Sequence, residues 1–137
     1  MWICRGGPVR ALMEAAGLWG VMVLPVAAEE IIAPSGQQVE WLETRQDVPG
    51  PEGLTFRFRF LAPDIDGKID TETALDDMQW LCDSWALPRI AGTGPQPMQV
   101  IISLAAREVP FGVASDDTTQ YFEAFRPEGG RCIWEIY

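Results

Sequence analysis

Hydrophobic and polar side chains alternate most regularly in residues 54–61. Three phenylalanines are separated there by Arg57 and Arg59, so an extended chain would carry the rings on one face and the guanidinium groups on the other. This alternation predicts a strand that is buried on one face. The run 98–104 is apolar at almost every position, which predicts a central strand of a sheet, covered by a helix on one side.

Three further segments have the composition of strands. Residues 39–45 are expected to form a strand before the alternating segment. Residues 119–126 and 131–137 are expected to pair as a hairpin, because the connection 127–130 ends in two consecutive glycines.

Residues 71–87 have the period of an amphipathic helix. The apolar positions at helical spacing are Ala74, Leu75, Met78, Leu81, Cys82, Trp85 and Ala86. The positions expected on the opposite, solvent-exposed face are Asp76, Asp77, Gln79 and Asp83. The candidates to cap the start of the helix are Asp70, Thr71 and Thr73, and Pro88 marks its end.

The predicted elements follow one another in the order β-β-α-β-β-β. This order predicts an α+β fold in which one amphipathic helix packs on a mostly antiparallel sheet. Residues 29–137 contain no internal repeat and no low-complexity tract, so a single domain is expected over this range.

Residues 1–28 have the features of a secretory signal peptide. Arg5 and Arg10 precede an apolar run over residues 15–26, and small side chains lead up to a predicted cleavage site near Ala28. A helix made from this run would span about 18 Å of a bilayer core that is roughly 30 Å thick, too little for a permanent anchor. The sequence therefore predicts a periplasmic or secreted protein; the alternatives are an uncleaved interfacial helix and a cytosolic amphipathic N-terminus.

The net charge indicates which partners the domain would attract. The whole chain carries −10, and removal of the predicted signal, with two arginines and one glutamate, leaves −11. Such a surface repels nucleic acid phosphates and anionic lipid headgroups, and it favours cationic proteins, cationic peptides or metal ions. Solubility alone is the other explanation of the charge, and the oligomeric state is not indicated.

Three cysteines are present, and the first of them lies in the predicted signal. The remaining pair, Cys82 and Cys132, is expected to form a disulfide in an oxidising compartment. The pair lacks the C-x-x-C spacing of catalytic dithiols, so a structural role is favoured over a redox-active one.

Five short segments resemble a family of short exported alphaproteobacterial proteins that is classed as a domain of unknown function. They are residues 33–36, 41–43, 86–97, 109–112 and 132–135. The most distinctive is the third, which runs from Leu-Pro-Arg-Ile to Gly-Pro-Gln-Pro. The resemblance implies a bacterial envelope setting and implies no activity, cofactor or site residues.

The absence of histidine removes much of the usual catalytic repertoire. Without histidine there is no Ser-His or Cys-His nucleophile pair and no histidine-ligated zinc. An enzyme would have to use carboxylates, tyrosines, Lys68 or arginines, as in carboxylate-based hydrolysis.

Two weaker patterns suggest ligand sites. Asp64, Asp66 and Asp70 have a spacing similar to that of the alternating oxygen ligands in calcium loops, but Lys68 occupies a ligand position and the glycine is misplaced, so a turn followed by a helix cap is favoured. Arg57 and Arg59 are candidates to bind an anion, although pairing with acidic residues across the sheet is favoured.

The function that these patterns favour is a non-enzymatic, protein-binding or accessory module of the cell envelope, with no cofactor. Its candidate partner surface is the turn-rich loop after the helix, together with an aromatic side chain at the helix edge. The residues proposed for it are Trp80, Thr93, Gly94, Pro95, Gln96 and Pro97. The alternative is a small-ligand or cation binder, or a carboxylate-based hydrolase, that uses the three aspartates.

Overall fold

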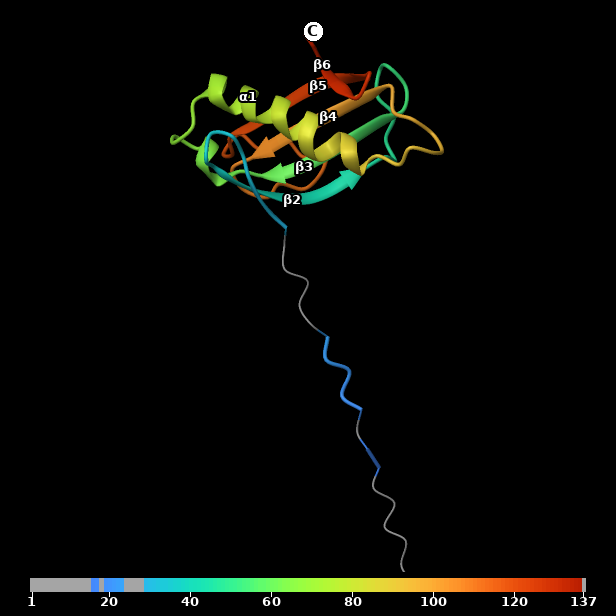
Figure 1. The fold of residues 1–137 in the computed structure, drawn as a ribbon. Coiled ribbons are helices and arrows are strands. Elements are labelled where there is room, and N and C mark those ends of the chain that lie inside the picture. The colour runs from blue at the N-terminus through green and yellow to red at the C-terminus, as the bar shows by residue number, and fades with distance from the viewer. Residues whose placement is uncertain (1–15, 18, 24–28, 137) are drawn as a thin grey trace, which may run out of the picture.

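The computed structural model describes residues 16–17, 19–23 and 29–136. Within these residues, six strands form one sheet in sequence order, and the helical segment 71–89 packs across one face (Figure 1). The strands are β1 (Glu30–Ile32), β2 (Gln38–Arg45), β3 (Thr55–Leu61), β4 (Gln99–Ala105), β5 (Gln120–Glu128) and β6 (Arg131–Glu135). Most of the predicted signal peptide, residues 1–28, lies outside the described residues.

The α+β class is confirmed, but the predicted order of elements is wrong at its start. The observed order is β-β-β-α-β-β-β, because β1 precedes the first strand that the pattern predicted. Its three residues are too few to show an alternation, and only pairing with β2, with Ile31 opposite Val39, makes them a strand.

The sheet is antiparallel except where β3 and β4 run parallel. A parallel pair requires a crossover connection, and here the helix supplies it. The connection contains the short 3₁₀ turn η1 (Pro63–Ile65), the helix α1 (Thr71–Trp80), a π-helical turn η2 (Leu81–Ala86) and a 3₁₀ turn η3 (Leu87–Arg89). The predicted central strand is β4, which lies between β3 and β5.

The core lies between the helix and one face of the sheet. The phenylalanines of β3 are buried on this face, as their alternation predicted, and the Phe58 and Phe60 rings pack nearly perpendicular to the Trp85 ring. Val100, Ile102 and Leu104 of β4 are fully buried. The loop 107–119 partly covers the opposite face, on which no helix packs within the described chain (Figure 1).

The predicted C-terminal hairpin is confirmed, with a shorter turn than expected. Gly129 and Gly130 both have positive φ, as a two-residue turn between right-twisted strands requires. Pro127 lies within β5, because the pairing of β5 with β4 ends at Phe125 and the missing proline N–H is not needed there.

Asp77 was expected on the polar, solvent-exposed face of the helix, and this prediction is wrong. Its side chain is buried, and its carboxylate accepts hydrogen bonds from the backbone N–H of Ser35 at 3.1 Å, from the Ser35 hydroxyl, and from Gln37 Nε2 at 2.6 Å. The helix therefore uses a charged residue to hold the turn between β1 and β2. Its neighbour Asp76 is exposed, as predicted.

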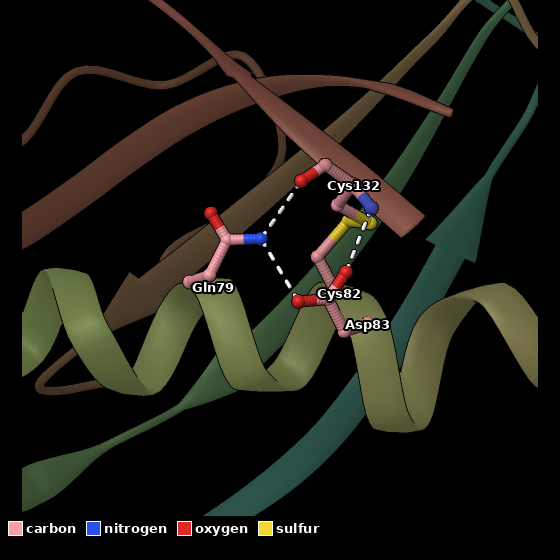
Figure 2. Close-up of a disulfide and its surroundings, with 4 residues drawn as sticks. All are labelled: Gln79, Cys82, Asp83 and Cys132. Carbon is pink, nitrogen blue, oxygen red and sulfur yellow. Dashed lines mark hydrogen bonds between the residues drawn. A yellow bond between two sulfur atoms is a disulfide. The ribbon is translucent and has the colours of Figure 1, made fainter. Parts of the chain in front are cut away.

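Cys82 and Cys132 form the predicted disulfide, with a Cα–Cα distance of 6.1 Å. Two helix side chains support it (Figure 2): Gln79 Nε2 donates to the Cys132 carbonyl at 2.9 Å, and Asp83 Oδ1 accepts the Cys132 N–H at 2.7 Å. These bonds occupy backbone groups that an edge strand would otherwise expose. Gln79 and Asp83 thus block pairing with another chain at the Cys132 position of the β6 edge.

The first turn of α1 makes stability pH-dependent. The Asp70 carboxylate accepts the Thr73 N–H at 2.7 Å, and this bond lowers the pKa of Asp70 because it favours the charged form. Since the folded-state pKa is depressed, the stabilisation is present above the unfolded value of about 3.9 and is lost as the pH falls through the folded value.

We therefore expect Asp70→Asn to flatten the loss of stability on acidification. Urea unfolding between pH 7 and pH 2 measures this slope. Asp66→Asn changes an exposed carboxylate four residues away and serves as the matched control. An unchanged slope in the Asp70 variant would contradict the assignment.

Candidate functional site

A pocket lies where the end of the helical segment meets β2, β3 and the loop that follows. Its volume is about 510 Å³, and Trp41, Trp85, Phe56 and Phe58 provide its aromatic lining. The centres of the two indole rings are 5.9 Å apart. Pockets of this size with aromatic walls are typical of binding sites. We call it the aromatic pocket.

Arg89 forms the charged part of this pocket. Its guanidinium carbon lies 3.7 Å from the ring centre of Trp85, and its Nη1 donates to the Trp85 carbonyl at 2.9 Å. Its Nη2 also pairs with Glu29 at 2.9 Å, so the formal charges at the rim offset each other. Stacking on the indole leaves the guanidinium in a fixed orientation over an apolar surface.

The loop 92–97 contributes Thr93 and Pro95 to the same pocket. Gln96 holds the loop, because its Nε2 donates to the carbonyls of Ala91 at 2.9 Å and Gly94 at 3.2 Å. The positive φ of Gly94 permits this tight curve. The loop is therefore preorganised by its own side chain.

The residues predicted for the partner surface do not all meet. Thr93, Gly94, Pro95 and Gln96 are exposed, whereas Pro97 is buried. Trp80, expected at the helix edge, is half-buried against the core and is not part of the pocket lining.

The predicted site did not include Trp41, Trp85 or Arg89. Trp85 was left out because the helical pattern assigned it to the core. That assignment is correct, since Trp85 is 6% exposed. Its Nε1 is buried with no hydrogen-bond partner among the described residues, which is unusual for an indole in a core. The spacing of Trp85 and Arg89, four residues apart in a helical segment, was the available signal.

The acidic cluster forms a turn and a helix cap. Lys68 lies 3.7 Å from an Asp64 carboxylate oxygen, Asp66 accepts a weak bond from the Thr119 hydroxyl at 3.4 Å, and Asp70 caps α1. Among the described residues, no group of three acidic, cysteine or histidine side chains is arranged to hold a metal ion. Calcium binding here stays an untested prediction.

The two arginines of β3 have partners within the protein. Arg59 pairs with Glu43 of β2 and also donates to the Val109 carbonyl, and Arg57 donates to the Val48 carbonyl. The predicted cross-sheet pairing thus holds for Arg59, while Arg57 uses a backbone acceptor instead.

Comparison with known proteins identifies a family whose function is unknown. A family model described as "Family of unknown function (DUF6497)" matches residues 16–137. The chain belongs to this family. The predicted classification as a domain of unknown function is therefore confirmed for this DUF6497 member. Searches of curated proteins and of solved structures each found no match.

The matched range includes every residue that lines the aromatic pocket of this DUF6497 protein. Within the described part of the chain, no helix is both long and apolar enough to cross a membrane.

Proposed function

We propose that this DUF6497 protein is a non-enzymatic module that binds another protein through the aromatic pocket, as an accessory subunit in the bacterial cell envelope. The observation that carries the proposal is the convergence of Trp41, Trp85 and Arg89 with the preorganised loop 92–97 around one cavity. Tryptophan and arginine are among the residue types most enriched at binding hot spots.

The rigidity of the site supports the same proposal. The loop is fastened by Gln96, and Arg89 is held by two hydrogen bonds and a stacking contact. A surface that is ordered before binding loses less conformational entropy when a partner docks. Export would follow from signal cleavage near Ala28, and the disulfide is compatible with an oxidising compartment.

Substitutions in the pocket test this proposal. We expect Trp41→Ala and Arg89→Ala each to weaken partner capture at least 10-fold, because loss of a hot-spot side chain costs about 2 kcal/mol or more. The measurement is affinity capture of the C-terminally tagged protein from its native cells under mild crosslinking, quantified by mass spectrometry.

Trp134→Ala is the matched control, since Trp134 is a half-exposed tryptophan on β6, whereas Trp41 is on β2. A captured protein that disappears with both pocket variants and persists with Trp134→Ala supports the proposal. Capture that survives both pocket variants, or a failure to capture any protein stoichiometrically, counts against it.

A further inference from the structure

A second cavity lies on the other face of the sheet, beneath the loop 107–119. The loop is pinned at its base, where the Ala106 N–H donates to the Thr119 carbonyl at 3.0 Å and Arg107 Nη2 donates to the Asp117 carbonyl at 2.7 Å. Arg59 donates to the Val109 carbonyl further along. A loop of this length without regular structure commonly has a function.

Phe111 fixes the middle of the loop over β2 and β3. The guanidinium carbons of Arg45, Arg59 and Arg57 lie 4.1, 5.7 and 6.0 Å from the centre of its ring. The Phe111 ring therefore packs between the loop and strands β2 and β3. A cavity of about 510 Å³ lies beside this ring, against β4 and β5. This volume is within the range of small-molecule sites.

Ser103 of β4 lines this cavity and lacks a partner. In the sheet register Ser103 lies between Arg59 and Phe122, so its side chain faces the loop and not the helix. It is 8% exposed, and its hydroxyl makes no hydrogen bond within the described part of the chain. The residue is mostly buried but its hydroxyl oxygen is accessible from the cavity, so a ligand bound there would supply its hydrogen-bond partner.

The remaining lining indicates the chemistry of that ligand. Leu42, Ala105 and Phe122 give an apolar wall, and Gln120 adds a neutral amide. The cationic group in the lining, Arg59, already pairs with Glu43. An anion would have to compete with Glu43, and the −10 charge of the chain opposes it.

A cation is disfavoured as well. Asp116 is the carboxylate in the lining, and its side chain is exposed, so water screens it. We propose that the cavity beneath the loop 107–119 binds an uncharged amphipathic small molecule, with its polar group on Ser103 and its apolar part against Phe122. This site is separate from the aromatic pocket and does not depend on the proposed function.

Three probes that share the phenylalanine side chain test which charge the cavity prefers in a ligand. N-acetyl-phenylalanine amide is uncharged, N-acetyl-phenylalanine is an anion and phenylalanine amide is a cation. Each is titrated into the ¹⁵N-labelled protein and followed by amide chemical shifts. We expect the uncharged probe to bind with a dissociation constant on the order of 1 mM, with saturable shifts in residues 101–105, 107–119 and 120–122. The charged probes should bind at least several-fold more weakly.

Variants test the residues. Ser103→Ala should weaken binding of the uncharged probe about 2- to 12-fold, the range for one hydrogen bond. Phe122→Ala removes an apolar wall at a 63% exposed residue and keeps the test available if the Ser103 variant does not fold. Ile133→Ala, a half-exposed residue of β6 that is not in the lining, is the matched control and should leave binding unchanged.

Saturable binding of the uncharged probe that weakens in the Ser103 and Phe122 variants supports the site. The proposal is overturned if no probe gives saturable shifts, if the charged probes bind as well as the uncharged one, or if Ile133→Ala weakens binding as much as Phe122→Ala. These outcomes do not depend on whether the aromatic pocket binds a protein partner.

Discussion

Asp77→Ala is expected to destabilise the protein by about 3–5 kcal/mol, a large effect for a position that the helical pattern assigned to the polar face. The substitution removes the acceptor of three hydrogen bonds, two from Ser35 and one from Gln37. Gln37 is 2% exposed, so its amide donor would be left unpaired in the interior. Urea unfolding followed by tryptophan fluorescence measures the difference.

Asp76→Ala is the control for this prediction. The residue is adjacent, carries the same charge and is exposed, so its substitution should change stability by no more than about 0.5 kcal/mol. Equal effects of the two substitutions would show that helix charge, and not the buried carboxylate, explains the result. Ser35→Ala should fall between them, because it removes the hydroxyl that donates to Asp77 and accepts from the Gln37 N–H at 3.3 Å, but leaves the other two bonds to Asp77.

Loss of the Cys82–Cys132 disulfide is expected to cost about 4 kcal/mol of unfolding free energy. The bond closes a loop between residues 50 positions apart, and opening that loop restores conformational freedom to the unfolded chain. Unfolding of the oxidised protein, the reduced protein and the double variant Cys82→Ala/Cys132→Ala measures the effect.

The hydrogen bonds around the disulfide make a second readout possible. Gln79 and Asp83 still contact Cys132 through its backbone after reduction, so β6 should stay docked in the reduced native state. Gln79→Ala in the reduced protein should then increase hydrogen exchange in β6 beyond either change alone. An unchanged unfolding midpoint on reduction would contradict the expected role of the bond.

The residues predicted for the partner surface coincide only in part with the aromatic pocket, and the reasons are specific. The loop 92–97 was visible because its prolines and glycines interrupt all regular structure. Its companions Trp41 and Arg89 come from β2 and from the end of the helical segment, and no local pattern joins positions that far apart in the sequence. Pro97 was included by sequence proximity alone and is buried.

Local periodicity sufficed for most elements of the fold. The alternation around Arg57 and Arg59 defined β3 and its buried face, the helical period defined the crossover helix, and two adjacent glycines defined the hairpin. The count of cysteines sufficed to predict the disulfide. The strand, the helix and the hairpin depend on residues that are neighbours in the chain. The disulfide could be predicted because only two cysteines remain after the predicted signal, so only one pairing is possible.

Tertiary structure alone decided the features that need two distant segments. Strand β1 exists because β2 pairs with it, and Asp77 is buried because the β1–β2 turn supplies its donors. The cavity under the loop 107–119 exists because Phe111 rests on arginines from two strands. Each depends on the free energy of contacts between segments, and that free energy has no counterpart in the periodicity of either segment by itself.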